Sequence, residues 1–289
     1  MAVTVHPVPD RAVFWFGCNL VRHGEVIRAS ARLLEAVGVA AETAGGPANC
    51  CGATQEASAR ITEGMGRRTV DGFNARLAGA EHGQVITWCP SCHMNMQDVM
   101  APVTPTNFET THITEVLHAR QDRLRALLAR PVPVRVLLHR HLGFQPRVPV
   151  NSLVADLLRL IPGLTLVDDP LAVPGHMCSS LSSVPGALAA AQRATLDAMA
   201  ASGADTLATI FHSCHRESVM LERGRPWLRV ANWIHLLAES AGWPAEDGYK
   251  AIRNAEDPRA ALGETGLAAA GEAVFERLME PELRKAPVV

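Results

Sequence analysis

Five of the seven cysteines form a spaced set that could hold an inorganic cofactor. Cys18 is followed after 31 residues by the adjacent pair Cys50 and Cys51, and then after 37 residues by Cys89 and Cys92. Thiolates are soft ligands that both zinc and iron–sulfur clusters accept. A tetrahedral zinc ion takes four ligands, whereas five thiolates from three separate segments suit an iron–sulfur cluster. The spacing therefore predicts an iron–sulfur centre bound by these five cysteines.

Three other interpretations of the five cysteines remain open. They could be buried free thiols, because unpaired cysteine is common in protein cores. Zinc could bind four of them and leave the fifth without a role. Finally, Cys89 and Cys92 could form a redox-active C-x-x-C pair at the start of a helix, but Cys50 and Cys51 would then have no function.

A second group of possible ligands lies in the other half of the sequence. It contains two cysteines and five histidines: Cys178, Cys214, His139, His141, His176, His212 and His215. A mixed cysteine–histidine site suits zinc or another iron centre. We expect such a site to use Cys178, Cys214, His139 and His212. The alternative is that these histidines line an interdomain cleft and bind no metal.

His139 and His212 are also candidate catalytic residues. A histidine that faces the first centre could protonate a leaving thiolate, because its ordinary pKa lies near neutrality.

The segments around the cysteines predict an α/β fold. Residues 13–16 and 85–88 have strand character and end next to Cys18 and Cys89, while residues 25–37 and 57–77 have the apolar periodicity of helices. Ligand sites of α/β sheets lie at the carboxyl ends of the strands. The cysteines are therefore expected in loops at one edge of a sheet.

The second half of the sequence repeats this plan. Strands are predicted over 134–138 and 206–211, and helices over 154–160 and 187–200. The segment His212-Ser213-Cys214-His215 matches the earlier Pro90-Ser91-Cys92-His93. In this alignment His139 takes the place of Cys18, and Met177-Cys178 that of the cysteine pair. The pattern indicates an internal duplication whose second copy has lost most of its cysteines.

We therefore expect two pseudo-symmetric halves, each a small, mostly parallel sheet flanked by helices. Residues 1–130 would form the domain that binds the iron–sulfur cluster, and 131–245 its degenerate repeat, with a proline-rich junction at 130–133. Residues 246–289 would form a C-terminal tail that packs or docks on this body.

Composition narrows the class of protein. With 289 residues, 48% of them hydrophobic, the chain can bury a full core. A net charge of −2 gives no electrostatic argument for nucleic acid or an acidic membrane. The sequence has no apolar run of about 18 residues, so no membrane span is expected. Seven cysteines, an odd number in a chain of this size, favour reduced thiols or metal ligands in the cytoplasm.

The three cysteine groups resemble the cysteine-rich CCG domain family, which includes the disulfide-cleaving subunit of heterodisulfide reductase. The family pattern is a cysteine, a gap of thirty-odd residues, C-C-G, a similar gap and then C-x-x-C, usually present twice. Here the first copy reads Cys50-Cys51-Gly52 and Cys89-Pro90-Ser91-Cys92, and the resemblance is specific over 13–120. It implies a noncubane [4Fe-4S] cluster held by Cys18, Cys50, Cys51, Cys89 and Cys92.

The resemblance also implies a function, namely thiol/disulfide or related sulfur redox chemistry on a small thiol or disulfide. The chain would be the substrate-converting subunit. It has no ferredoxin-type C-x₂-C-x₂-C run and no nucleotide fingerprint, so electrons would come from a ferredoxin-like or flavoprotein partner. The second half keeps two cysteines, and a second noncubane cluster is not expected there. The alternatives are a non-catalytic electron-transfer subunit and a zinc-binding module.

Residues next to the cysteines have expected supporting roles. Gly52 would let the backbone approach inorganic sulfur, and Pro90 would fix the turn between its flanking cysteines. His93, Trp15 and Trp88 would supply a hydrogen-bond donor and dry walls that tune the potential of the cluster.

Overall fold

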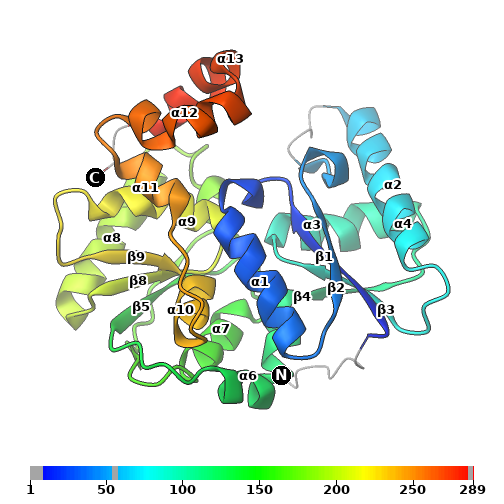
Figure 1. Ribbon diagram of the computed structural model, residues 1–289, viewed down its shortest axis with the longest axis horizontal. Helices are drawn as coiled ribbons and strands as arrows, with labels where there is room; N and C mark the ends of the chain where they lie inside the picture. The colour runs from blue at the N-terminus through cyan, green and yellow to red at the C-terminus, as the bar shows by residue number, and fades with distance from the viewer. Residues whose placement is uncertain (1–8, 54–57, 286–288) are drawn as a thin grey trace.

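The computed structural model describes residues 9–53, 58–285 and 289, and it contains a parallel β-sheet in each half of the chain (Figure 1). The first sheet has the strand order β2-β1-β3-β4. Its strands are β1 (Arg11–Gly17), β2 (Ala41–Gly45), β3 (Gly83–Thr87) and β4 (Glu109–His112). The helices of this half are α1 (Gly24–Ala36), α2 (Ala59–Arg76), α3 (Pro90–Asn95), α4 (Ala101–Val103), α5 (Ile113–His118) and α6 (Gln121–Leu127), with the short helical turns η1 (Leu20–Arg22), η2 (Pro47–Asn49) and η4 (Met96–Met100).

The second sheet repeats this order as β6-β5-β8-β9, and β7 pairs with the end of β5. Its strands are β5 (Arg135–His141), β6 (Thr165–Leu166), β7 (Ala172–Val173), β8 (Thr206–Thr209) and β9 (Arg229–Asn232). The helices of this half are α7 (Val150–Leu158), α8 (Ala187–Ser202), α9 (His212–Ser218) and α10 (Trp233–Ser240), with the turns η5 (Cys178–Ser180) and η6 (Val219–Glu222).

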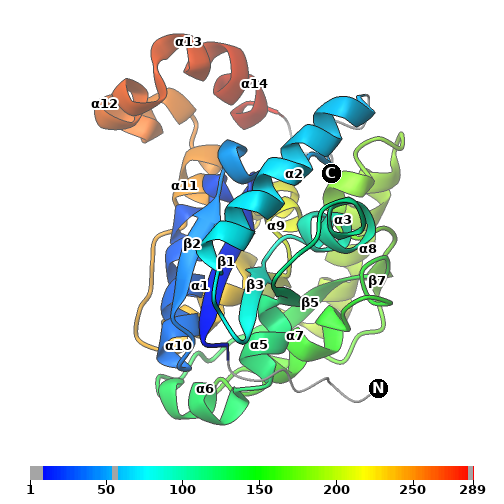
Figure 2. The same cartoon turned by 90° about the vertical axis from the view of Figure 1, so that its right-hand side faces the viewer.

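The central strands are apolar because helices cover both faces of each sheet. Every residue of β3 and of β8 is buried. Helix α1 turns Val26, Leu33 and Leu34 inward, as its 3.6-residue periodicity predicts. It lies between the two sheets and packs against α10, whereas α2 lies on the outer side of the first sheet (Figures 1 and 2). One cluster of buried apolar side chains therefore extends through both halves.

The α/β prediction with two parallel sheets flanked by helices is confirmed. The predicted elements are present with shifted ends: α7 begins at Val150 rather than 154, and β8 ends at Thr209 rather than 211. Helix α2 begins at Ala59; residue 57, where the sequence placed its start, lies outside the described residues. The domain limits at 130/131 and 245/246 stay a prediction.

The strand register corrects one part of the predicted alignment between the halves. Trp15 of β1 pairs with Thr87, and His139 of β5 pairs with Thr209. The two threonines hold equivalent positions in the two halves, because the hydroxyl of each is hydrogen-bonded to the histidine six residues further along the chain. His139 therefore corresponds to Trp15, three residues before Cys18, and does not take the place of that cysteine.

The C-terminal segment forms helices beside the second sheet, at the orange and red end of the chain in Figure 1. They are α11 (Gly248–Asn254), α12 (Pro258–Ala270), α13 (Glu272–Val274), the turn η7 (Phe275–Met279) and α14 (Glu280–Leu283). Tyr249, Phe275 and Leu283 are buried in the core cluster of the second half. Within the described part of the chain, no helix is both long enough and apolar enough to cross a bilayer.

Candidate functional site

One cavity of about 340 Å³ is lined by all five cysteines of the first half: Cys18, Cys50, Cys51, Cys89 and Cys92. The Sγ atoms of Cys18 and Cys50 are 3.5 Å apart, and those of Cys51 and Cys92 are 3.7 Å apart. All seven cysteines of the chain are free thiols. The three loops thus bring five soft ligands to one point, as the spacing predicts.

Each of the loops that carry Cys18 and the C-P-S-C motif follows a strand of the first sheet. Cys18 comes directly after β1, and Cys89 is the N-cap residue of α3, two residues after β3. Pro90 occupies the first position of α3, where its missing N–H costs no hydrogen bond. Cys92 then lies in the first turn of that helix. The carboxyl ends of parallel strands meet at one edge of the sheet, which is why these loops converge.

Hydrogen bonds hold the loop that carries the adjacent pair. The Thr69 hydroxyl donates to the Cys50 carbonyl at 3.1 Å, and the Asn95 amide donates to the Cys51 carbonyl at 2.6 Å. The Trp15 indole donates to the Asn49 carbonyl at 2.8 Å. These donors come from α2, α3 and β1, so three different elements fix the loop.

Contacts between thiols shift the pKa values of the two adjacent cysteines in opposite directions. Hydrogen bonds from Cys50 and Cys92 hold the pKa of Cys51 well below its ordinary value. The same contact with Cys51, together with burial, raises the pKa of Cys50. Burial raises the pKa of Cys18. Cys51 is therefore the thiol of the adjacent pair that these contacts favour as the thiolate.

Part of the cavity wall comes from the second half. It includes His176, His212 and Arg216. The His176 ring lies between two hydroxyls, with Nε2 at 3.1 Å from Ser91 Oγ and Nδ1 at 3.3 Å from Ser180 Oγ. His176 thereby ties the C-P-S-C loop to the second half. Arg216 pairs with Glu217 at 2.7 Å and puts a positive charge at the cavity.

His212 is buried and faces this cavity. Its ring lies 5.9 Å from that of Trp88, and its Nδ1 atom has no hydrogen-bond partner among the described residues. Burial lowers the pKa of His212 to about 4, with Arg216 adding to the effect. The ring is therefore neutral near pH 7, and it can offer a hydrogen bond to a bound sulfur atom rather than a stored proton.

The three flanking residues differ in their roles. Trp15 is fully buried and fixes the loop before the cysteine pair, and Trp88 is a buried wall beside His212. His93 instead bonds Thr87 Oγ1 at 2.8 Å and packs its ring against Phe144. The expected donor role of His93 toward the cysteines is thus not seen in these contacts.

A second convergent group lies in the other half and consists of His139, His141, Cys178 and Cys214. All four residues are buried, and their ligand atoms lie within 4.8 Å of one another. The strand β5 supplies both histidines, since residues two apart point to the same face of a strand. Cys178 comes from η5 and Cys214 from α9.

The distances in this group match those between the ligands of one ion. His139 Nε2 lies 3.2 Å from Cys178 Sγ, and His141 Nε2 lies 3.2 Å from Cys214 Sγ and 3.6 Å from Cys178 Sγ. A tetrahedral zinc ion with its usual bond lengths places nitrogen and sulfur ligands about 3.5 Å apart. A buried group of two histidines and two cysteines of this shape could hold a metal ion.

The contacts divide the predicted Cys/His group into three sets. His139, Cys178 and Cys214 lie together as expected, but His141 is the fourth member in place of His212. His212 and His176 line the cavity of the five cysteines. His215 belongs to neither set, and its Nε2 lies 2.6 Å from Asp247 Oδ2.

The sequence around the cysteines also matches a known family. Residues 12–97 match the CCG family, described as a cysteine-rich domain. The matched residues, here called the CCG region, include all five cysteines of the cavity. CCG domains are typical of iron–sulfur redox proteins of the heterodisulfide reductase type. No curated protein matches the chain.

Some residues of these sites could not be found from the sequence. Arg216 is an exception, because it lies four residues after His212. A helix predicted over that segment would have placed both side chains on the same face of the helix. Asp247 gave no signal, because its spacing from His215 along the chain matches no ligand motif. The two residues meet only through the packing of the C-terminal segment on the second half.

Proposed function

We propose that the chain binds a noncubane [4Fe-4S] cluster and acts in thiol/disulfide or related sulfur redox chemistry, in the manner of the disulfide-cleaving subunit of heterodisulfide reductase. The observation that supports this most is the convergence of five cysteines on one cavity inside the CCG region. Zinc on four of them would leave one thiol unused. An isolated C-x-x-C pair would not need the other three cysteines.

The donor set fits the cluster. Five cysteine thiols line one cavity, contacts with Cys50 and Cys92 lower the pKa of Cys51, and the adjacent Cys50 and Cys51 would both hold the cluster. Gly52, which follows the pair, has a φ of 82°, a conformation that favours glycine. Because glycine has no Cβ atom, the backbone of this turn can lie close to a bound group. When bound, such a cluster supplies electrons and an iron atom at which a substrate sulfur can bind.

The residues opposite the cysteines would position a sulfur substrate. Reduction of a disulfide takes two electrons and two protons and yields two thiols. His212, neutral and without a partner at Nδ1 in the described part of the chain, would hydrogen-bond the substrate sulfur. Its low pKa means that the protons themselves would come from solvent or from the electron donor. Of the two candidate catalytic histidines, His139 belongs to the second group and does not line this cavity.

Arg216 favours an anionic substrate. Its guanidinium lines the cavity, and the neighbouring Glu217 carboxylate occupies only part of its hydrogen-bonding capacity. A small thiol that carries a carboxylate, sulfonate or phosphate would meet this cation on the wall facing the cysteines.

Electrons would reach the site from another protein. The proposal includes a ferredoxin-like or flavoprotein partner, because the sequence contains neither a ferredoxin-type run nor a nucleotide fingerprint. A reducing compartment, the cytoplasm, would keep the seven thiols free for metal.

The second group is proposed to bind a single zinc ion. His139, His141, Cys178 and Cys214 supply the two nitrogen and two sulfur ligands of a tetrahedral structural site. An ion there would tie β5 to η5 and α9, the helix that begins with His212. Its role would be to hold the wall of the cavity rather than to take part in redox chemistry.

The proposal is tested by the response of the cluster to thiols. Anaerobic protein is oxidised and titrated with 2-mercaptoethanol and with thiols that carry a carboxylate or a sulfonate, and electron paramagnetic resonance follows the cluster. We expect a thiol-dependent change in the spectrum. Arg216→Gln should raise the concentration needed for anionic thiols about tenfold, the size expected of one charge-assisted hydrogen bond, and leave 2-mercaptoethanol unaffected. A cluster that a redox partner reduces but that no thiol perturbs would instead support a pure electron-transfer subunit.

A further inference from the structure

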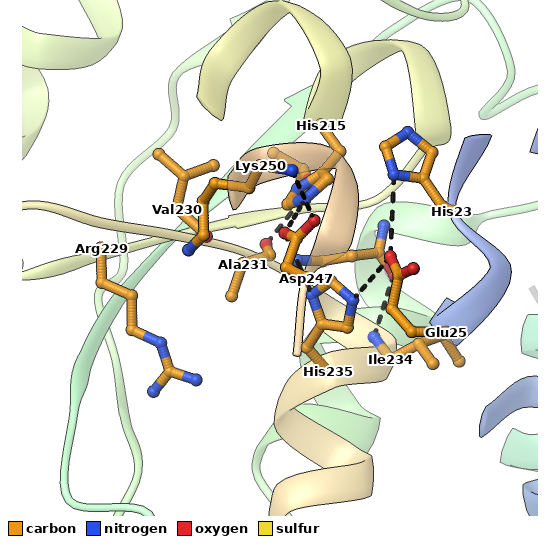
Figure 3. A network of polar contacts seen from close by, with 12 residues as sticks. His23, Glu25, His215, Arg229, Val230, Ala231, Ile234, His235, Asp247 and Lys250 are labelled. Carbon is orange, nitrogen blue, oxygen red and sulfur yellow. Dashed lines mark hydrogen bonds and ion pairs between the residues drawn. The ribbon is translucent and has the colours of Figure 1, made fainter. Parts of the chain in front are cut away.

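A third cluster of polar side chains lies where the two halves and the C-terminal segment meet (Figure 3). His23 precedes α1 in the first half, His215 lies in α9 of the second half, and Asp247 is the N-cap of α11. Each histidine is 1% exposed, and the Asp247 side chain is 9% exposed. Their ligand atoms lie within 4.8 Å of one another.

The His215–Asp247 contact is the firmest in this cluster. The imidazole Nε2 lies 2.6 Å from Asp247 Oδ2, and the Lys250 backbone N–H donates to Asp247 Oδ1 at 3.0 Å. On its other side, His215 Nδ1 lies 3.2 Å from Thr209 Oγ1. The proton between Nε2 and the carboxylate is the one that a metal ion replaces, since ligation requires the nitrogen lone pair.

His23 contributes to this cluster a buried nitrogen that has no hydrogen-bond partner in the described part of the chain. Its Nδ1 atom is buried without a hydrogen-bond partner among the described residues, and the Glu25 Oε1 atom is 3.8 Å away. The His23 ring lies 5.2 Å from the His215 ring. Burial lowers the pKa of His23 well below its ordinary value, which leaves the ring uncharged and its lone pair free. A buried polar atom without a partner needs an explanation, and a bound ion is one that the neighbouring His215 and Asp247 could share.

His235 and Glu25 complete the surroundings. The Asn232 backbone N–H donates to His235 Nδ1 at 3.2 Å, so the proton of the neutral ring lies on Nε2, which is 3.4 Å from Glu25 Oε1. His235 therefore lies beside Glu25 without a lone pair to offer, and neither His235 Nε2 nor Glu25 Oε1 has a hydrogen-bond partner among the described residues. Figure 3 shows the Glu25 carboxylate between His23 and His235.

We propose that His23, His215 and Asp247 bind one divalent metal ion, zinc or iron(II), with the Glu25 carboxylate beside it. Two histidines and one carboxylate are a recurrent ligand set for both ions. Thr209 and the Lys250 N–H hold the ligands from behind, as partners of metal ligands usually do. The ion would join three segments that are distant in sequence, and so clamp the two halves and the C-terminal helices around α9.

The site is tested with cobalt(II) as a probe, in full-length protein prepared anaerobically. Cobalt held by nitrogen and oxygen ligands gives visible d–d bands without the near-ultraviolet charge-transfer band of cobalt thiolates. This difference separates the proposed site from both cysteine-containing sites. We expect one tightly bound cobalt of the thiolate-free kind per chain, displaced by zinc, in the wild-type protein.

Variants assign that ion to the cluster. Asp247→Asn keeps the size of the side chain and should weaken cobalt binding at this site at least tenfold, as should His23→Gln. The matched control is His118→Gln with Asp156→Asn, another His–Asp pair, 3.4 Å apart at a partly exposed position; this variant should bind cobalt as the wild type does. If the wild-type protein binds only thiolate-coordinated cobalt, the proposal is wrong, whether or not the variants fold. Unchanged thiolate-free binding in Asp247→Asn and His23→Gln would overturn it as well.

Discussion

At the scale of single residues, Cys51 is central to the candidate cluster site. It receives hydrogen bonds from Cys50 and Cys92, which lower its pKa, and its carbonyl is held by Asn95. Cys51→Ala should therefore abolish cluster binding, with nearly all iron lost from anaerobically purified protein. Cys214→Ala is the matched control, since Cys214 is equally buried but belongs to the second group; it should keep its iron. Equal iron in both variants would contradict the assignment of the ligands.

A second residue-scale prediction concerns His112, the buried N-cap of α5. Its Nδ1 accepts from the Thr114 N–H, and its Nε2 lies 3.1 Å from the Trp88 carbonyl. Burial lowers its pKa to about 3. The unfolded chain, with an ordinary histidine pKa near 6.5, binds the proton first as the pH falls. His112 thus favours the folded state above about pH 6.5 and loses this contribution progressively below it.

The size of the effect follows from the two pKa values. Between about pH 7 and pH 5, His112 should remove about 2 kcal/mol from the free energy of unfolding. His112→Asn retains a capping residue, because Asn232 occupies the same position in the second half. Urea unfolding at both pH values should show a loss about 2 kcal/mol smaller in His112→Asn than in the wild type. An identical pH dependence would mean that His112 is protonated in the folded state.

At the scale of elements, the turn after β1 places Cys18. Gly17 has a φ of 75°, and a Cβ atom there would lie 3.0 Å from Cys92 Sγ. Gly17→Ala should therefore lower stability by about 1–2 kcal/mol through backbone strain and also displace a ligand, so that iron content falls. Gly203→Ala is the matched control: its φ is 64°, and no atom lies within 4 Å of the added Cβ. It should lose similar stability but no iron, and iron loss in both variants would point to general destabilisation.

The sequence predicted elements better than it predicted their register. Apolar runs and helical periodicity were sufficient for the strands and helices around the cysteines, because these patterns record which face of each element is buried. These patterns could not show that His139 corresponds to Trp15. A strand can pair with its neighbour in more than one register, and the residue types in the strand are the same in each register. The strand pairs His139–Thr209 and Trp15–Thr87 resolve this. The same register explains why His141, two residues further along β5, joins His139 in the second group.

At the scale of the whole molecule, the two halves share a sheet topology but carry different sites. The first half keeps the five cysteines, and the second half contributes His176, His212 and Arg216 to their cavity. Contacts of this kind join segments that are distant along the chain, and no local pattern in the sequence reports them. This is why the five cysteines could be predicted from spacing, whereas the true neighbours of His212 and of His215 could not.

The assignment of an iron–sulfur cluster to the five cysteines is tested best by measuring iron, acid-labile sulfide and zinc per chain in protein purified without oxygen. A single [4Fe-4S] cluster on the five cysteines predicts about four iron and about four sulfide per chain. Zinc in addition would agree with the second group and with the cluster of His23, His215 and Asp247. Zinc without iron and sulfide, or no metal at all in anaerobic protein, would show that the five cysteines do not bind an iron–sulfur cluster.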